Sequence, residues 1–422
     1  MDKLVIEGGH RLAGVVEVSG AKNAALPILA ATVLTKEKSV IKNVPQVADI
    51  LTMVKILKAL GARVSMAGDT VEIDPSGIRN PELTYKLVST MRGSICFLGP
   101  FLGRFGQAKI SFPGGCVIGP RPIDLHLKGV RALGAEVNLD HGYVVAKVKQ
   151  LKGTRLYLGG SFGSSVLGTA NVMMAATLAK GRTVIDSAAC EPEVVDLGHM
   201  LRKMGAKIEG LGSPSIQIDG VKKLSGVHYS IIPDRIEAGT YVVASAMTRG
   251  DVTLKNVNLL MFGAVIDRLR EAGVIIYEKN GAMRVRRERH LRPVSVTTLP
   301  YPGFPTDLQA QMMALMCIVP GISVITEKIY PDRFMHVPEL NRMGANIMLE
   351  GNSAIVSGNK RLSGAPVMAS DLRASAALVL AGLVAEGATE VSRVYHLDRG
   401  YENLVAKLQG LGAKIRREKD VR

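Results

Sequence analysis

Apolar residues recur with a helical period before six glycines along the chain, and with a period of two after them. In the first copy, Ile50, Val54, Leu57 and Leu60 share one helical face before Gly61. A helix often ends at a glycine in the left-handed conformation, which other residues adopt only at a cost. The six glycines are Gly61, Gly134, Gly205, Gly273, Gly344 and Gly412, at intervals of 73, 71, 68, 71 and 68 residues. Six repeated units of about 70 residues therefore account for the chain.

Each unit also contains elements that are not amphipathic helices. Residues 65–73, 138–146, 209–218 and 348–356 alternate around Gly, Asp or Asn, a pattern that predicts β-hairpins. Stretches that are apolar nearly all round, such as 170–179, predict buried helices that run into a strand. The unit reads strand, helix, strand, helix, hairpin. The pattern therefore predicts an α/β fold made of six repeats.

The ends of the chain indicate how the repeats are grouped. The last unit stops at LGAKIRREKDVR, without a second hairpin strand. The N-terminal segment RLAGVVEVSGAKN resembles KLSGVHYSIIPDR and RLSGAPVMASDLR, which follow other hairpins. Residues 1–21 are therefore expected to complete the C-terminal set. This gives two three-unit domains, 22–229 and 1–21 plus 230–422, with a ligand-binding cleft expected between them.

Charge narrows the choice of partners. Lys and Arg number 53 against 37 Asp and Glu, a net charge of +16, of which residues 22–229 carry +11 and the remainder +5. Such a balance favours anionic partners. The chain has no Trp, 8 Phe and 10 Tyr, so it has few aromatic platforms for single-stranded nucleic acid. No zinc-finger spacing is present, and no metal site is expected. Anionic small molecules fit this composition best.

Cysteine content and apolar runs bear on the compartment. Four cysteines in 422 residues make no disulfide framework, which favours a reducing environment. The N-terminus has no apolar leader region. The longest clean apolar run, 374–385, is shorter than the roughly 20 residues that a spanning helix needs. We expect a soluble, cytoplasmic protein that does not enter a membrane.

The most informative loop for function is FPGGCVIGPRPIDLH, residues 112–126. Its Gly and Pro content excludes a regular element, and loops often carry functional residues. Cys116 stands near its middle, five residues before Arg121. A thiol near cations has a lowered pKa and can act as a nucleophile or proton donor, whereas an isolated thiol is an inert small side chain. Cys96 and Cys317 lie in apolar runs and fit the inert description.

Acidic and basic residues also meet at expected helix starts. Asp234–Arg235, Asp332–Arg333, Asp398–Arg399 and Asp371 with Arg373 are such pairs. The Asp can cap the helix N-terminus. An Arg in the first turn is unfavourable because its positive charge faces the positive end of the helix dipole. These arginines can therefore bind anions, or they can point into solvent and pair with the neighbouring Asp. Asp307, after a cap expected at Thr306, can stabilise a helix dipole or accept a proton from a substrate hydroxyl.

Three further residues are candidates for binding an anion. Lys22 and Asn23 open the first buried helix, at one expected domain crossing, where Lys22 can neutralise a phosphate or remain a surface lysine. Arg92, in STMRGSICFLG, stands where a helix meets an apolar run. An unpaired buried Arg there would be costly, so an anion is expected beside it.

These residues together resemble one family. SGAKNAALPIL, STMRGSI, PGGCVIGPRPIDLH, EPEVVD, PDRIEAGT, FPTDLQAQ, RFMHVPEL, MASDLRASAALVLAG and YHLDRGYE are similar to blocks of the UDP-N-acetylglucosamine 1-carboxyvinyltransferases, in the EPSP synthase superfamily. The likeness runs from end to end. It implies the enolpyruvyl transferase fold, a two-domain inside-out α/β barrel with three units per domain and the active site between the domains.

The resemblance also implies an activity. The family is a transferase that moves enolpyruvyl from phosphoenolpyruvate to the 3'-hydroxyl of UDP-N-acetylglucosamine and releases phosphate, without a metal or other cofactor. This is the first committed step of peptidoglycan biosynthesis, and so belongs to cell wall biogenesis, cell shape, the cell cycle and cell division. By the same resemblance, Cys116 is the general acid toward the phosphoenolpyruvate methylene, can form a covalent pyruvate adduct, and is the thiol that fosfomycin alkylates.

Other roles follow only from the resemblance. Asp307 is similar to the base for the sugar hydroxyl, and Lys22 and Arg399 join it and Cys116 as catalytic residues. The positions that correspond to phosphoenolpyruvate binding are Lys22, Asn23, Arg92, Arg121, Arg373 and Arg399. Those that correspond to UDP-N-acetylglucosamine binding are Asn23, Arg92, Arg121, Pro122, Ile123, Asp124, Leu125, His126, Ser165, Val166, Leu167, Asp307 and Ile329.

One block departs from the family pattern and two alternatives stay open. The family usually has Ser-Val-Gly-Ala-Thr near the diphosphate, whereas residues 164–169 read SSVLGT, which places Leu167 where Gly is expected. One alternative is a 3-phosphoshikimate 1-carboxyvinyltransferase, which shares the fold but lacks the cysteine loop. The other is a basic repeat protein that binds nucleic acid without catalysis, to which the scarcity of aromatic residues is an objection.

Overall fold

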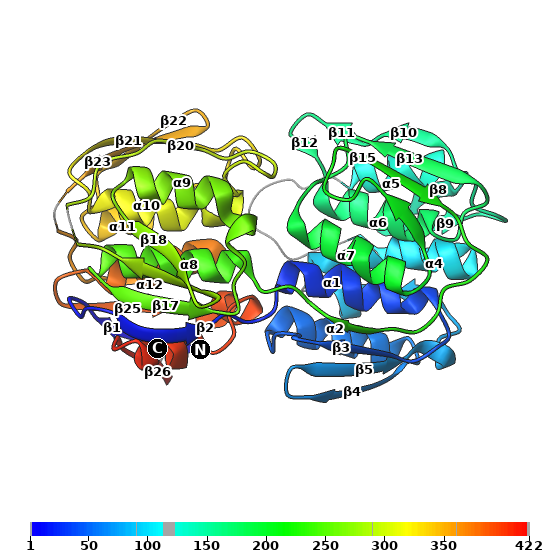
Figure 1. Cartoon of the computed structure of the whole chain (residues 1–422), viewed down its shortest axis with the longest axis horizontal. Helices are drawn as coiled ribbons and strands as arrows, with labels where there is room; N and C mark the ends of the chain where they lie inside the picture. The colour runs from blue at the N-terminus through cyan, green and yellow to red at the C-terminus, as the bar shows by residue number, and fades with distance from the viewer. Residues whose placement is uncertain (1, 90, 113–122, 289, 360, 420–422) are drawn as a thin grey trace. The chain divides into compact units, whose positions relative to one another are not determined.

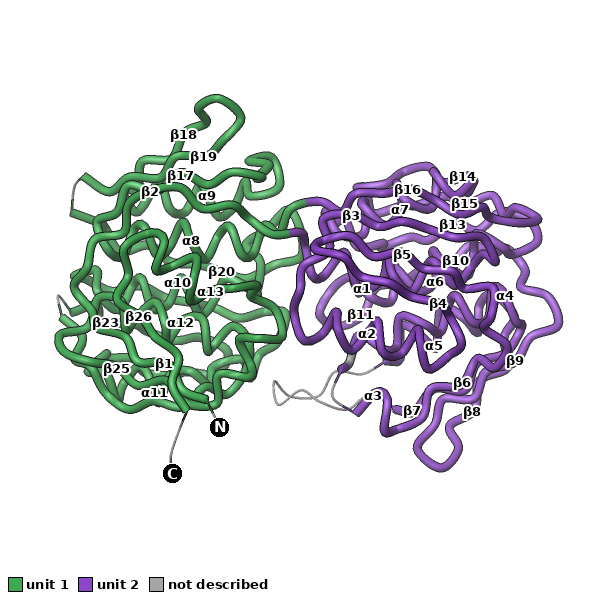
Figure 2. Tube along the Cα trace, turned by 90° about the horizontal axis from the view of Figure 1, so that it is seen from below, with its two compact units in different colours: residues 1–19, 117–119, 233–422 green, residues 20–116, 120–232 purple. Residues whose placement is uncertain are grey.

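The computed structural model describes residues 2–89, 91–112, 123–288, 290–359 and 361–419. They form two compact units, each with its own apolar core (Figure 2). Unit 1 contains residues 2–19 and 233–419, and unit 2 contains 20–112 and 123–232. The boundaries fall after Ser19 and Ile232, whereas the sequence pattern placed them after residues 21 and 229.

The described residues contain six four-stranded sheets with one topology. In each, the first strand runs parallel to the second, and the other two pairings are antiparallel. The unit 2 sheets have the orders β16(His228–Ser230)-β3(Ser39–Lys42)-β5(Thr70–Asp74)-β4(Arg63–Ala67), β6(Glu82–Leu83)-β7(Gln107–Ser111)-β9(Tyr143–Lys147)-β8(Glu136–Asp140) and β10(Arg155–Tyr157)-β13(Arg182–Asp186)-β15(Ser215–Asp219)-β14(Lys207–Glu209). A short β11(Gly159–Gly160)/β12(Gly163–Ser164) hairpin is added.

Unit 1 repeats the arrangement, which confirms the six-repeat α/β fold. Its sheets have the orders β2(Ala13–Glu17)-β17(Asp251–Lys255)-β19(Ala282–Arg286)-β18(Ile275–Lys279), β20(Val296–Thr297)-β21(Gly321–Thr326)-β23(Ser353–Gly358)-β22(Ile347–Glu350) and β24(Pro366–Met368)-β25(Ala388–Ser392)-β1(Asp2–Glu7)-β26(Lys414–Lys419). The strand that the C-terminal hairpin lacks is β1, which pairs antiparallel with β26. The RLAG segment forms β2 instead, parallel to β17.

Helices fill the interior of each unit and the sheets lie outside them (Figure 1). The helix before the second strand of each sheet is largely buried. These inner helices are α1(Lys22–Ala31), α4(Leu98–Phe105) and α6(Val166–Ala176) in unit 2, and α8(Arg235–Met247), α10(Gln309–Cys317) and α12(Leu372–Gly382) in unit 1. Their apolar composition on all faces explains their place in the core.

A second helix precedes each hairpin and buries one face. These helices are α2(Ala48–Ala59), α5(Asp124–Ala132), α7(Pro192–Lys203), α9(Gly263–Glu271), α11(Val337–Arg342) and α13(Leu404–Gly410). The remaining short elements are η1(Thr32–Leu34), η2(Pro75–Gly77), α3(Tyr85–Val88), η3(Arg92–Phe97), η4(Leu259–Phe262), η5(Thr306–Leu308) and η6(Val394–Arg399). All six repeat glycines follow these second helices with φ between 86° and 105°, as the sequence predicts.

Candidate active site

The most concentrated group of buried charges in the described part of unit 1 surrounds Asp307. Asp307 lies in η5, directly before α10. Its Oδ1 accepts a bond of 2.8 Å from Arg333 Nη1, and its Oδ2 accepts one of 2.8 Å from Arg373 Nη2. The two arginines are 5% and 2% exposed, so one carboxylate faces two buried guanidiniums. Arg333 also interacts with the carboxylate of Asp371, so the charges of this buried cluster largely balance.

The cluster sets the protonation of Asp307. Burial alone would raise its pKa, but the attraction of Arg373 and Arg333 outweighs burial and holds the pKa well below the ordinary range. Asp307 is therefore ionised at neutral pH, as a proton acceptor must be. Arg373 also has hydrogen-bonding capacity left, because its buried Nε and Nη1 make no hydrogen bond among the described residues.

A layer of uncharged polar groups lies behind the cluster. Gln311 Nε2 lies 3.0 Å from the Asp307 carbonyl oxygen and 3.2 Å from both Thr240 Oγ1 and Tyr401 Oη, so its two hydrogens are shared among three acceptors. Thr240 Oγ1 lies 2.9 Å from Tyr401 Oη. The guanidinium of Arg373 lies 5.4 Å from the ring centroid of Tyr401. These contacts hold the first turns of α8, α10 and η5 together, and they were not predicted from the sequence.

Glu327 connects the cluster with Ile329. This carboxylate is fully buried and accepts bonds from the Ile329 and Tyr330 backbone N–H groups at 2.8 and 2.9 Å. It also accepts from Thr298 Oγ1 at 2.6 Å and from Thr306 Oγ1 at 2.9 Å. Thr306 therefore binds Glu327 and does not cap the helix, contrary to the sequence-based expectation. The predicted residue Ile329 is held by a residue that the sequence analysis missed.

Two of the four Asp–Arg pairs that were expected at helix starts lie there. Asp234 caps α8 and Asp371 caps α12 through two backbone N–H groups each. Asp332 lies in a turn and Asp398 near the end of η6, so neither begins a helix. Asp398 pairs with Arg417 at 2.8 Å. Those two predictions are wrong because sequence spacing does not show which Asp–Arg pair coincides with a helix start.

Lys22 and Asn23 occupy the first turn of α1 in unit 2. Lys22 is 9% exposed, and its Nζ lies 3.3 Å from Asp49 Oδ2. The N-cap residue of α1, Ala21, makes no side-chain cap bond. A largely buried lysine at a helix N-terminus is a cation in a positive potential, and it suits an anionic ligand. The alternative of a surface lysine does not hold.

Several residues expected at the UDP-sugar meet around Gly168 in unit 2. Ser165 caps α6 by accepting from the Gly168 N–H at 3.1 Å. A Cβ on Gly168 would lie 2.8 Å from Ser165 Oγ and 3.6 Å from Leu125 Cβ. Val166 and Leu167 begin α6 and pack against the core of unit 2. The departure at Leu167 therefore places an apolar side chain on the core.

The start of α5 holds the rest of this group. Ile123 is buried, Asp124 opens α5, and His126 is 5% exposed. His126 Nδ1 lies 2.8 Å from the amide nitrogen of Asn171, which α6 supplies. Asn171 was not predicted.

Some predicted residues cannot be placed. Cys116, Arg121 and Pro122 lie outside the described residues, as does the side chain of Arg92, although the backbone of Arg92 begins η3. Arg399 ends η6. Burial raises the pKa of Cys96 and of Cys317 to about 12, so neither thiol is ionised at neutral pH.

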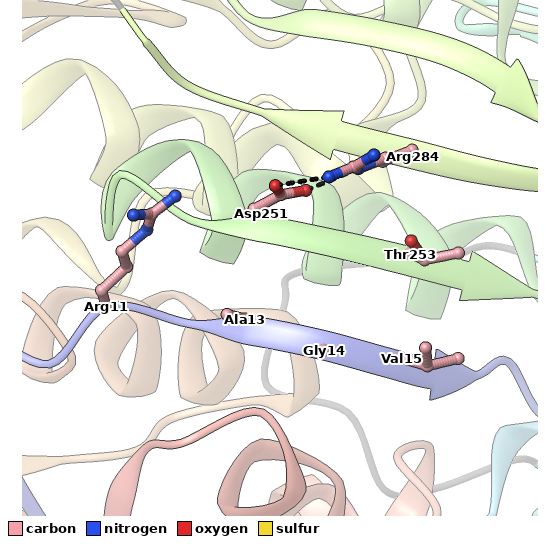
Figure 3. Close-up of a pocket in the computed structure, with 7 residues that line it drawn as sticks. All are labelled: Arg11, Ala13, Gly14, Val15, Asp251, Thr253 and Arg284. Atoms are coloured by element: carbon pink, nitrogen blue, oxygen red, sulfur yellow. Dashed lines mark hydrogen bonds and ion pairs between the residues drawn. The ribbon is translucent and has the colours of Figure 1, made fainter.

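Unit 1 also has an open depression of about 460 Å³, which differs from the buried Asp307 cluster in lying on the surface of a sheet (Figure 3). Its wall contains Arg11, Val15 and the bidentate Arg284–Asp251 pair, with bonds of 2.7 and 2.8 Å. Arg286 reaches the same Asp251 at 3.4 Å. These arginines of β19 are thus already neutralised, which fits a solvated strand face. None of the predicted site residues lines this depression.

Two absences complete the description. Across the described ranges, no helix has the length and apolar character to cross a bilayer. Within the same ranges, no group of three or more His, Cys, Asp or Glu side chains is arranged to hold a metal ion.

Comparison with known proteins gives consistent matches. The profile of the EPSP synthase (3-phosphoshikimate 1-carboxyvinyltransferase) family matches residues 6–408. A protein of Geotalea uraniireducens is 56% identical over 415 residues, covering 98% of this chain and 99% of its own, and one of Geobacter metallireducens is 54% identical over 421 residues, covering 100% of both. Both are named UDP-N-acetylglucosamine 1-carboxyvinyltransferase.

Solved structures share the fold. The enolpyruvyl transferase NikO from Streptomyces tendae superposes with a TM-score of 0.91 at 26% identity, over 99% of both chains. EPSP synthase from Acinetobacter baumannii superposes with a TM-score of 0.78 at 18% identity, over 99% of this chain and 100% of its own. This similarity covers both units and confirms the expected fold.

Proposed function

The chain belongs to the EPSP synthase family, and we propose that within it the protein is a UDP-N-acetylglucosamine 1-carboxyvinyltransferase. The observation that carries the proposal is identity of 54–56% over nearly the whole chain with proteins of that name. The protein transfers enolpyruvyl from phosphoenolpyruvate to the 3'-hydroxyl of UDP-N-acetylglucosamine and releases phosphate. This function serves peptidoglycan synthesis, and we place it in the cytoplasm.

The buried charges support this chemistry. Both substrates are anions, and the resemblance assigns phosphoenolpyruvate to five cations, Lys22, Arg92, Arg121, Arg373 and Arg399. Arg373 offers two buried N–H donors that bind nothing among the described residues. Donors that are held in place before the substrate arrives stabilise charge without a reorganisation cost.

We assign the proton transfers to two residues. The Cys116 thiol protonates C3 of phosphoenolpyruvate, and the sugar O3' forms a bond to C2 while Asp307 takes the hydroxyl proton. The C2–O bond to phosphate then breaks while C3 returns a proton to the Cys116 thiolate, which restores the vinyl group and the thiol. The low pKa of Asp307 makes it a weak base. It can therefore take the proton only as the O–C bond forms, when the hydroxyl becomes acidic.

A phosphate-release assay tests the proposal. Purified protein with phosphoenolpyruvate should release phosphate only when UDP-N-acetylglucosamine is present, because the acceptor is part of the reaction. Shikimate 3-phosphate serves as the alternative acceptor. Release with shikimate 3-phosphate alone would contradict the proposal, and release without any acceptor would indicate simple hydrolysis.

Replacing Cys116 tests the proposed proton donor. Cys116→Ala should nearly abolish turnover at neutral pH and leave binding of UDP-N-acetylglucosamine largely intact, since alanine has no proton to donate. Cys190→Ala, which removes a half-buried thiol beside Glu191, is the matched control. Fosfomycin should modify the wild type at Cys116 and not the Cys116→Ala variant. Wild-type turnover in Cys116→Ala would contradict the assignment.

A further inference from the structure

Asn171 is a buried amide in the middle of an otherwise apolar stretch of α6. Its side chain is 0% exposed, and a buried amide is costly unless it is hydrogen-bonded. Asn171 makes three bonds to three other elements. Its Oδ1 accepts from the Gly99 N–H of α4 at 2.8 Å, and its Nδ2 lies 2.9 Å from the Ile95 carbonyl oxygen of η3 and 2.8 Å from His126 Nδ1 of α5.

The partners fix the direction of every bond. A backbone N–H can only donate, so the atom that faces Gly99 must be the amide oxygen. A backbone carbonyl can only accept, so the atom that faces Ile95 must be the NH₂ group. The second hydrogen of that NH₂ group then points to His126 Nδ1, which must accept it. An imidazole that accepts at Nδ1 is neutral and carries its proton on Nε2.

The packing leaves the amide little freedom to turn. A Cβ on Gly99 would lie 2.2 Å from the backbone oxygen of Asn171, so α4 and α6 are in close backbone contact at this point. A reversed amide would oppose N–H to N–H at Gly99 and oxygen to oxygen at Ile95. Two independent backbone groups therefore enforce one orientation of Asn171, and through it one tautomer of His126.

We propose that Asn171 is a positioning residue, which holds His126 as the neutral Nε2–H tautomer and so makes it a hydrogen-bond donor toward the UDP-sugar. The inference rests on the proposed function, since that function places His126 at the UDP-sugar. The phosphate, hydroxyl and carbonyl oxygens of a UDP-sugar accept such a bond. A ring held in the other tautomer would present an acceptor at Nε2 and oppose these oxygens.

Nitrogen NMR of the full-length protein, labelled with ¹⁵N-histidine, tests the tautomer without any substrate. His126→Gln identifies the His126 signals by their disappearance. We expect the Nδ1 resonance of a nitrogen without a proton and the Nε2 resonance of a protonated nitrogen. A proton on Nδ1 in the wild type would overturn the inference.

Asn171→Asp tests the consequence for substrate binding. One carboxylate oxygen can still accept from Gly99 N–H, but the other can only accept, so Nδ1 must carry a proton. The variant is assayed at a pH at which its nitrogen spectrum shows a neutral ring, so that this is the only proton of the ring and Nε2 has none. We expect the KM for UDP-N-acetylglucosamine to rise about tenfold, equivalent to about 1.4 kcal/mol, with the KM for phosphoenolpyruvate changed less than twofold. Thr177→Val is the control, because it removes another fully buried polar group of the same chain segment, a hydroxyl that donates to the Met174 carbonyl oxygen within its own helix turn.

The outcomes are distinguishable. An unchanged KM for the UDP-sugar in a folded Asn171→Asp protein would overturn the positioning role, and so would an equal rise in both KM values. If Asn171→Asp does not fold, the wild-type nitrogen spectrum still decides the tautomer. If the wild type does not use UDP-N-acetylglucosamine at all, the proposed function fails, while the spectrum continues to test the effect of Asn171 on His126.

Discussion

The two units are built from the same repeat, but the N-termini of their inner helices are capped differently. In unit 1, Asp234 and Asp371 cap α8 and α12 with their own carboxylates, and Asp307 precedes α10. In unit 2, α1 begins without a side-chain cap and α6 is capped by the neutral Ser165. In unit 1, carboxylates of the protein therefore lie at the positive N-terminal ends of the inner helices. In unit 2, no carboxylate caps α1 or α6.

The difference separates two kinds of chemistry on one scaffold. In unit 1, Arg333 and Arg373 keep the carboxylate of Asp307 ionised in the resting protein, and this carboxylate is the proposed proton acceptor. Unit 2 keeps positive helix ends and Lys22, which suit the anionic groups of a substrate. The larger positive charge of residues 22–229 agrees with this division. A repeated fold can thus divide a reaction by changing only the residues at helix starts.

The largest effect is expected from making unit 1 resemble unit 2. Asp307→Asn keeps the shape of the side chain and removes the charge, so the proton acceptor is lost. We expect kcat to fall by about 10²–10⁴, the usual contribution of a general base. Steady-state turnover with both substrates measures the change.

A matched control exists in the same unit. Asp251 also pairs with two arginines, Arg284 and Arg286, but on the outer sheet. Figure 3 shows its pair with Arg284. Asp251→Asn should leave kcat within twofold of the wild type. If Asp307→Asn and Asp251→Asn behaved alike, the special role of the Asp307 cluster would be refuted.

The reverse exchange should have a smaller effect. Ser165→Asp gives α6 the kind of cap found in unit 1, so the helix itself should remain stable. The new charge would repel an anion held at that helix end, and we expect the KM for UDP-N-acetylglucosamine to rise about tenfold or more, as Coulomb repulsion at an effective dielectric of about 20 allows. Asn258→Asp, at the cap of η4, adds the same charge at another helix start as a control. An unchanged KM in Ser165→Asp would contradict an anion site there.

The smallest effect on turnover, and a change in stability instead, is expected at Asp196. This buried carboxylate of α7 accepts from Tyr229 Oη at 2.5 Å and has no cation partner in the described structure. Burial raises its pKa to about 6, the opposite of the shift at Asp307. Between about pH 4 and 6, the carboxyl of Asp196 is therefore protonated in the folded state and ionised in the unfolded state. The free energy of unfolding falls as the pH rises through that range.

Urea unfolding at several pH values measures this shift. Two pKa units correspond to about 3 kcal/mol, which the wild type should lose between about pH 4 and 6 through Asp196. Asp196→Asn should lose less over the same range and keep normal turnover, while Asp219→Asn, at an exposed pair with Arg182, should follow the wild type. Parallel curves for Asp196→Asn and the wild type would count against the raised pKa.

Local sequence patterns predicted most of the fold. The glycine spacing and the alternation of apolar residues identified the six repeats, because helix ends and hairpins are determined by nearby residues. The caps at Asp234 and Asp371 were also correct. The same local logic failed at Thr306 and Asp398, whose partners, Glu327 and Arg417, lie far along the chain.

The candidate site was predicted only in part for the same reason. Its charged residues stand in recognisable motifs, so Asp307, Arg373 and Lys22 were proposed from the sequence, and their roles stay predictions. Asn171 and Glu327 were missed, because their significance lies in contacts with residues 29–76 positions away. A buried polar residue within an apolar stretch, as at Asn171, is the one sequence signal that could have identified such a position.

The most direct test of the proposed chemistry is the reaction run in D₂O, with the product examined by NMR. Protonation of C3 by Cys116, followed by loss of a proton from the resulting methyl group, should place deuterium in the vinyl group of the enolpyruvyl product. This incorporation should require UDP-N-acetylglucosamine and should be lost with turnover in Asp307→Asn. A product whose vinyl group contains no deuterium would contradict the account, because it would mean that C3 is never protonated.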